Sequence, residues 1–201
     1  MAPMTVPVVT ALRACGPGRV AVDLDGSPWR VVPLQAVYGT GLAIGRTLDR
    51  ATARSLRREL RRLDAQREAL RALRARDHTA ASLEQRLAER GTTRTMRQET
   101  LEIVQRAGLV DDRRFAASRA ALLARRGAGD LLIADDLERQ GVPAATAREV
   151  IAGLEPEGAR AAALIASRGM SPKTARFLAA KGFSEGSLEA LVADLAADAI
   201  E

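Results

Sequence analysis

Residues 133–141 read Ile-Ala-Asp-Asp-Leu-Glu-Arg-Gln-Gly, in which two apolar residues four positions apart are followed by a glycine. The same pattern occurs twice more, at Leu83, Leu87 and Gly91 and, more loosely, at Leu178 and Gly182. Apolar residues four apart lie on one face of an α-helix, and glycine commonly follows a helix end because it adopts the left-handed conformation. The pattern therefore predicts three short helices, each ended by a glycine.

The spacing of these glycines indicates a repeat. They lie 50 residues apart (91 to 141) and then 41 residues apart (141 to 182). Similarity at periods of roughly 20–50 residues is typical of stacked helical units, none of which can bury its apolar face alone. We therefore expect a mainly α fold: an elongated array of three tandem three-helix repeats. Such arrays usually bind partners along a surface and do not enclose a reaction pocket.

A small β module is expected before the repeats. Val20 and Val22 alternate with smaller or polar residues, which is the period-two pattern of a half-buried strand. Asp25-Gly26 predicts a two-residue hairpin turn, and Trp29 and Val31 continue on the return strand. Residues 5–13 form a plausible third strand. The expected module is thus a hairpin or a three-stranded sheet.

A long helix is expected next, from about residue 50 to 75. Its apolar stripe consists of five leucines at spacings of four, three, seven and three, namely Leu56, Leu60, Leu63, Leu70 and Leu73. These elements divide the chain into four parts: a β-rich module (1–48), a basic linker helix with the first repeat (49–108), a second repeat (109–153) and a third (154–201).

Charge is distributed unevenly. Residues 50–76 hold ten arginines and three acidic residues, a net charge of +7, whereas residues 127–201 sum to −5 and the whole chain to +6. Arginine binds phosphate and carboxylate in a bidentate manner, so we expect the basic half to contact DNA phosphates or acidic protein. The candidate contact residues are Arg57, Arg58, Arg61, Arg62, Arg74, Arg76, Arg86, Arg90, Arg94 and Arg97.

Other residues are expected to shape helix ends. Thr79 is a suitable N-cap, with Asp130 and Ser171 at the matching positions of the later repeats. Asp112 is expected to cap the helix that contains Phe115, and Asp111 adds favourable charge at the same helix end. Phe115 is expected to stabilise the fold by burial of its ring. Gly91, Gly141 and Gly182 are expected in the left-handed conformation, and Gly127 and Gly129 form a joint between helices.

No catalytic, metal-binding or cofactor-binding set is predicted. Asp111 and Asp112 lack a histidine or cysteine cluster beside them, and His78 is the single histidine. Residues 127–129 lack the preceding strand and the Gly-Lys-Ser/Thr ending of a phosphate loop. A lone cysteine, Cys15, and the absence of a signal peptide or an 18-residue apolar run favour a cytoplasmic protein that does not enter membranes.

Two stretches resemble the RecX family. Residues 69–91 are similar to its first repeat, and a string in the second repeat matches more closely: Leu109-Val110-Asp111-Asp112-Arg113-Arg114-Phe115-Ala116. Residues 159–195 resemble a degenerate third repeat. The resemblance implies a regulator, not an enzyme, that binds the RecA recombinase and its nucleoprotein filament. It implies inhibition of ATP hydrolysis, strand exchange and co-protease activity in DNA repair and the damage response. We expect a monomer, because binding along a filament needs no self-association.

The sequence departs from the family pattern in its second repeat, which is usually basic. Here Asp130, Asp135 and Asp136 occur, so phosphate contacts are expected in the basic half of the chain. Two other interpretations stay open. A direct DNA-binding regulator would hold single- or double-stranded DNA through its phosphates by basic helices. A generic helical scaffold would explain the repeats but not the Leu-x-Asp-Asp-x-x-Phe-Ala string.

Overall fold

The computed structural model describes residues 6–189. Its contacts divide the chain into two compact units. The first comprises the residues up to Arg71 together with Leu87–Thr100, and the second comprises Ala72–Arg86 and the residues from Leu101 onward. Thr5 of the expected first strand and the end of the expected fourth part, after residue 189, lie outside the described residues.

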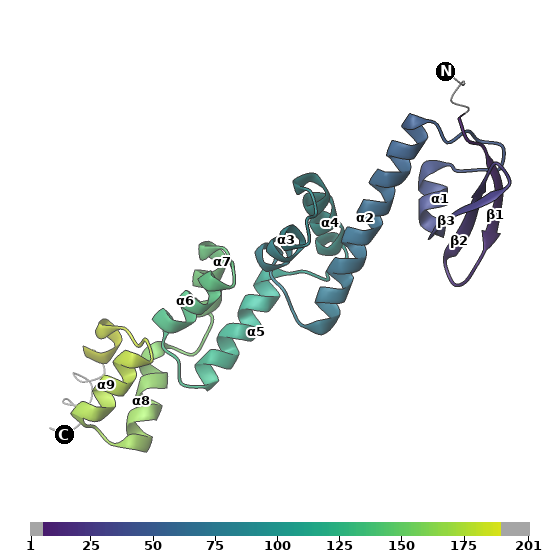
Figure 1. Ribbon diagram of the computed structural model, residues 1–201. Helices are drawn as coiled ribbons and strands as arrows, with labels where there is room; N and C mark the ends of the chain where they lie inside the picture. Colours follow the sequence, from purple (N-terminus) through teal and green to yellow (C-terminus); the bar gives the residue numbers. More distant parts are fainter. Residues whose placement is uncertain (1–5, 190–201) are drawn as a thin grey trace. The chain divides into compact units, whose positions relative to one another are not determined.

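The N-terminal sheet, whose strands are labelled in Figure 1, belongs to the first unit. Strands β1 (Val9–Ala14), β2 (Arg19–Leu24) and β3 (Ser27–Pro33) pair antiparallel in the order β1-β2-β3. Asp25 and Gly26 both have positive φ, at 49° and 81°, as a tight hairpin turn requires. The three-stranded prediction is confirmed.

The buried face of the sheet differs in one respect from the sequence pattern. Trp29 and Val31 lie on β3 as expected but are 40% and 43% exposed, whereas Val32 is fully buried. The pairing of β2 with β3 shifts register between Val22 and Asp23. Helix α1 (Leu34–Thr40) was not predicted, and its residue Val37 packs with Val32 in the core of the sheet.

Helix α2 (Arg50–Ala75) has the predicted bounds. Leu56 and Leu63 are buried and pack against Ala36 of α1, so α2 covers the sheet module through α1. Leu70 was expected on the same stripe but is 42% exposed. Beyond Leu63 the buried face consists instead of small residues, Ala65, Ala69 and Ala72, which permit closer backbone approach than leucine.

The rest of the described chain is helical, which confirms the mainly α prediction. The helices are α3 (Ala80–Glu89), α4 (Arg94–Arg106), α5 (Asp112–Arg125), α6 (Asp130–Arg139), α7 (Ala144–Ala152), α8 (Glu157–Arg168) and α9 (Pro172–Ala180), and residues 185–189 are also helical. In the second unit Ile133 and Leu137 are fully buried beside Ala116 and Ala120, while Phe115 is only half-buried against this cluster. The division into four parts stays a prediction.

Successive repeats meet through helix ends. The Thr79 hydroxyl, at the start of α3, donates to the Gln140 carbonyl at the end of α6, at 2.6 Å. One repeat later, the Gly129 N–H at the start of α6 donates to the Lys181 carbonyl at the end of α9, at 2.8 Å. A hydrogen bond from the start of one helix to a carbonyl at the end of another thus joins α3 to α6 and α6 to α9, although the donor is a side chain in the first case and the backbone in the second.

The terminal glycines explain how these ends can approach so closely. Gly91, Gly141 and Gly182 all have the expected left-handed φ, between 74° and 77°. A Cβ on Gly141 would lie 2.5 Å from the Ala81 Cβ, and one on Gly182 would lie 2.5 Å from the Leu132 nitrogen. A Cβ on Gly91 would meet nothing within 4 Å. The second and third glycines therefore serve the repeat contact as well as the helix end.

Two capping predictions are wrong. Asp111, not Asp112, caps α5, because its carboxylate accepts from the Arg114 N–H at 2.9 Å. Asp112 instead accepts from the Ala80 N–H at 2.8 Å and so caps α3 from the neighbouring repeat. Proximity in the sequence suggested that Asp112 caps its own helix, α5. The stacking of the repeats instead brings the start of α3 within hydrogen-bond distance of the Asp112 carboxylate.

Asp130 is likewise not a cap, because it is the first residue of α6 and Gly129 precedes it without a side-chain cap. The Glu157 carboxylate at the start of α8 accepts from the Asp130 N–H at 2.6 Å, which repeats the arrangement of Asp112. Thr79 and Ser171 are confirmed as N-caps, at 3.0 Å and 3.2 Å from the N–H groups of residues 82 and 174.

The three aspartates of α6, Asp130, Asp135 and Asp136, form ion pairs within the second unit. Asp136 on α6 accepts two hydrogen bonds from Arg119 on α5, at 2.8 and 2.9 Å. Asp130 pairs with Arg160, and Asp135 pairs with Arg139 one helical turn away. The hydrogen bond and charge of Arg119 hold the pKa of Asp136 below its ordinary value, despite the opposing effect of burial.

We predict that the Gly141→Ala substitution destabilises the protein by about 3 kcal/mol, because it combines the left-handed strain with an overlap against Ala81. Gly91→Ala should cost only about 1–2 kcal/mol, from strain alone. Adding Ala81→Gly to Gly141→Ala removes the overlapping atom, so the double variant should be more stable than the sum of the single effects by about 1 kcal/mol or more. Urea unfolding followed by circular dichroism measures wild type, the Gly91→Ala, Gly141→Ala and Ala81→Gly variants, and the double variant. Strictly additive costs would contradict the close contact.

We also predict that Asp136→Asn lowers stability at pH 7 by about 1.5 kcal/mol, because it removes a charge-assisted bidentate pair. The matched change Asp135→Asn affects an exposed pair and should cost at most about 0.5 kcal/mol. A depressed carboxyl pKa stabilises the fold above the unfolded pKa, ordinarily 3.8, and this contribution is lost as the pH falls through the folded pKa. The gap between wild type and Asp136→Asn should therefore close between about pH 4 and pH 2, and a gap unchanged at low pH would refute the assignment.

Candidate interaction surfaces

One face of α2 carries a stripe of four exposed arginines. Arg50, Arg54, Arg57 and Arg61 follow one another at spacings of four, three and four residues, which places them on the same side of a helix. No ion pair joins any of them to another described residue. At 1.5 Å per residue the stripe extends about 16 Å. It offers four guanidinium groups for which residues 6–189 provide no carboxylate partner.

Other arginines of α2 have local partners. Arg62 donates to Glu59 through two bonds of 2.5 and 2.8 Å, and this pairing raises the pKa of Arg62 and lowers that of Glu59. Arg58 lies 3.4 Å from Glu99 of α4. The remaining pairs on this helix are Arg67 with Asp64 and Arg71 with Glu68. These arginines are partly neutralised where they stand.

A hollow of about 500 Å³ lies in the first unit between α2 and the turn that precedes α4. Arg61 lines it, together with Glu68 and residues 90–93. Arg90 lies 3.6 Å from the Glu68 carboxylate, which also pairs with Arg71. Of the two other candidates in this unit, Arg94 is exposed, and Arg97 is half-buried and donates to the Thr92 carbonyl at 2.8 Å.

The last three candidates, Arg74, Arg76 and Arg86, belong to the second unit. Arg74 and Arg76 are exposed at the end of α2, while Arg86 is half-buried on α3. His78 lies between Arg76 and Arg86 in the sequence and is buried. Its Nδ1 atom shares a hydrogen bond with the Ser82 hydroxyl at 3.0 Å. Burial, followed by the charges of Arg76 and Arg86, lowers the pKa of His78 below its ordinary value, which favours the neutral ring. The His78 side chain therefore contributes to the structure at the start of α3.

The described residues contain no cluster of histidine, cysteine or carboxylate groups that could hold a metal ion. Among the helices of residues 6–189, none combines the length and apolar character needed for a membrane span. What the geometry offers is exposed, permanently charged guanidinium groups on rigid helices. Such groups suit binding to phosphate or carboxylate.

Known proteins with similar sequences share one description. A Regulatory protein RecX from Halorhodospira halophila is 34% identical over 135 residues, which cover 62% of this chain and 84% of that protein. This chain belongs to the RecX family. The RecX protein of Mycobacterium leprae is 31% identical over 144 residues, covering 64% of this chain and 84% of its own. No model of a known protein family matches the chain.

Solved structures agree on the fold. A crystal structure of regulatory protein RecX aligns with a TM-score of 0.78 at 20% identity, over 92% of this chain and 98% of its own. RecX from Lactobacillus salivarius aligns with a TM-score of 0.59 at 18% identity, over 67% of this chain and 96% of its own. The RecX resemblance seen in the sequence and the mainly helical fold are confirmed. The curated relatives are named regulatory proteins.

The candidate contact residues stay a prediction, but the structure sorts them. Of the ten, Arg57 and Arg61 belong to the unpaired stripe, whereas Arg58, Arg62 and Arg90 have carboxylate partners. Arg50 and Arg54, which complete the stripe, were not among the contact residues predicted from the sequence. The ten arginines of residues 50–76 were counted together as one charged segment, so the four-three-four spacing within them was not recognised.

Proposed function

We propose that this protein is a regulator that binds the RecA recombinase and its DNA filament and inhibits ATP hydrolysis, strand exchange and co-protease activity. Membership of a family whose relatives are named regulatory proteins carries the proposal. The unpaired arginine stripe of α2 supports it, because it supplies cations for acidic protein surface or DNA phosphate at the filament. In this proposal the protein acts in the cytoplasm, as a monomer, by binding and without catalysis of its own.

The proposed mechanism is electrostatic attachment followed by restraint. In this proposal the four arginines project from one folded helix, α2, so binding orders few side chains beyond the arginines themselves. A regulator held across neighbouring recombinase subunits would oppose the movements that accompany ATP hydrolysis. The four exposed arginines would then govern the strength of attachment, while the helical repeats would govern its geometry.

We predict that changing Arg50, Arg54, Arg57 and Arg61 together to glutamine weakens inhibition of the DNA-dependent ATPase of the cognate RecA. Exposed ion pairs contribute roughly 0.2–1 kcal/mol each, so the loss of four should raise the concentration for half inhibition by about fourfold or more. Titration of the ATPase with wild type and variant at fixed salt measures the shift. Absence of inhibition by stoichiometric wild-type protein would reject the proposed function itself.

A matched control removes the same charge from the same helix. Arg58, Arg62, Arg67 and Arg71 already have carboxylate partners, so their replacement by glutamine should shift half inhibition less than about threefold. Circular dichroism of both variants checks that α2 stays folded. Equal losses in the two variants would show that total charge matters and the stripe does not.

A second candidate function, direct DNA binding without recombinase, is favoured by the same stripe. Four phosphate contacts would give a plot of log K against log salt with a slope of about −3 to −4. Fluorescence anisotropy with labelled single- and double-stranded oligonucleotides, measured between about 50 and 200 mM salt, tests this prediction. A shallow slope, or the same slope in the stripe variant, would remove the stripe from any DNA contact.

A further inference from the structure

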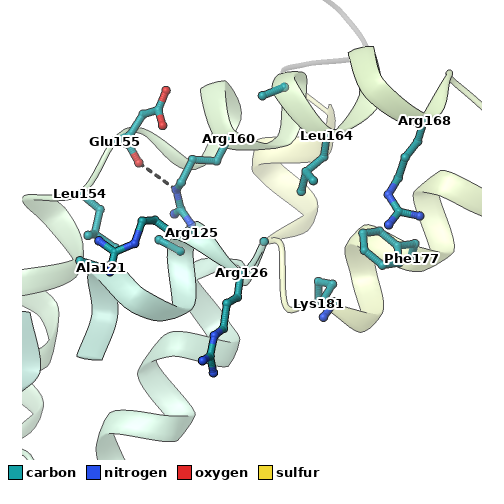
Figure 2. A pocket seen from close by; sticks show the side chains of 13 residues that line it. Ala121, Arg125, Arg126, Leu154, Glu155, Arg160, Leu164, Arg168, Phe177 and Lys181 are labelled. Atoms are coloured by element: carbon teal, nitrogen blue, oxygen red, sulfur yellow. Dashed lines mark hydrogen bonds between the residues drawn. The ribbon is translucent and has the colours of Figure 1, made fainter. Parts of the chain in front are cut away.

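A second cationic surface lies in the second unit, where the end of α5 meets helices from the acidic part of the chain. A hollow of about 640 Å³ opens in the second unit between the end of α5 and the helices α8 and α9 (Figure 2). Its floor is apolar and is formed mainly by Ala124, Leu154, Leu164 and Phe177. Its edge is formed by four cationic residues, Arg125, Arg126, Arg168 and Lys181.

These four cations have no carboxylate partner within residues 6–189. The only acidic side chain in the lining is that of the exposed Glu155. By contrast, the acids of the neighbouring helix α6 are already bound, Asp130 to Arg160 and Asp136 to Arg119. The negative net charge of residues 127–201 is therefore partly consumed within the fold, and the hollow itself is positive.

The walls of the hollow are held by a buried arginine. Arg160, only 8% exposed, donates to the Ala128 carbonyl at 2.7 Å. It also donates to the Glu155 carbonyl at 3.0 Å (Figure 2). These bonds tie the α5–α6 turn and the α7–α8 loop to helix α8. All three nitrogens of Arg160 already donate to the protein, to Glu155, Ala128 and Asp130. We therefore assign Arg160 to the shape of the hollow and the edge cations to a ligand.

The aromatic ring in the hollow distinguishes between ligand classes. The Arg168 guanidinium lies over the Phe177 ring, 4.0 Å from its centroid (Figure 2), and the Lys181 ammonium lies 5.7 Å from it. Single-stranded nucleic acid is usually bound by stacking of bases on exposed aromatic faces. A base would have to displace Arg168 to stack on the ring face that this guanidinium covers, and sugar and phosphate would leave the apolar floor poorly covered.

We propose that this hollow binds an acidic peptide segment that also carries apolar side chains. Leucine or phenylalanine side chains would cover the floor, while aspartate and glutamate carboxylates would pair with the four edge cations in the bidentate geometry that arginine favours. The apolar contacts supply area removed from water, and the charges fix orientation and exclude basic segments. The inference concerns a different surface from the α2 stripe and does not rest on the recombinase proposal.

The test measures binding of a fluorescein-labelled 16-residue peptide to the full chain by anisotropy. The probe has Asp or Glu at about half its positions and Leu or Phe at about four others. A second peptide replaces those apolar residues with Ser, and a 16-nucleotide single strand represents nucleic acid. We expect micromolar binding of the first probe, with the Ser peptide and the oligonucleotide at least about tenfold weaker at this hollow.

Two variants with equal charge change localise the site. Arg125, Arg126 and Lys181 changed to glutamine should weaken the acidic–apolar peptide at least about tenfold, whereas Arg148, Arg176 and Lys173, exposed elsewhere in the unit, should have little effect when changed likewise. Ala163→Glu, a surface change in the lining, should also weaken it.

Three results would overturn the proposal. Equal losses in the two triple variants would show non-specific attraction. Equal binding of the Ser peptide would exclude the apolar floor. Oligonucleotide binding as tight as the peptide and sensitive to the same triple variant would make the hollow a nucleic-acid site.

Discussion

The contact between the end of one repeat helix and the start of the helix in the preceding repeat is the constraint on which the second unit depends. Thr79 with Gln140, and Gly129 with Lys181, join backbone and side-chain groups that helix ends would otherwise leave unpaired. The approach is possible because Gly141 and Gly182 have no Cβ. One residue type thus ends the helix and sets the distance to the neighbouring repeat.

The carboxylates at the starts of α5 and α8 reinforce this contact. Asp112 and Glu157 occupy the first position of their helices, and each accepts an N–H from the first residue of a helix in the preceding repeat. Burial acts to raise the pKa of Glu157, but hydrogen bonds from Ser184, the Asp130 N–H and Ser187 hold it below its ordinary value. The repeats are therefore connected by donors and acceptors that recur at equivalent positions.

Local patterns in the sequence were sufficient for much of the fold. The glycine-ended helices, the Asp25-Gly26 turn and the bounds of α2 follow from turn chemistry and periodicity, which depend on near neighbours. The errors concern partners distant in sequence. Asp112 was predicted to cap its own helix because its actual partner, the Ala80 N–H, lies 32 residues away in the sequence. Leu70 was predicted to be buried because the leucine spacing does not show that alanines form the buried face of α2 beyond Leu63.

The candidate surfaces show the same limit. The net charge of each segment predicted the basic character of α2. It also made residues 127–201 look uniformly acidic, although Asp130 and Asp136 are paired with arginines within the fold. Arg125 and Lys181 are separated by 56 positions (181 − 125) and meet at one hollow only through the packing of α5 against the following repeat. The surface charge that a partner meets is thus the charge left after internal pairing, which requires the structure.

The central claim is that unpaired arginines on rigid helices attach this RecX-family protein to the recombinase filament. The most direct measurement is a cryo-electron microscopy map of RecA–DNA filaments saturated with the protein. The account predicts density for the protein on the filament, with the face of α2 that carries Arg50, Arg54, Arg57 and Arg61 against acidic side chains or DNA phosphates. Saturated filaments without the protein, or a bound protein whose α2 stripe faces solvent, would contradict it.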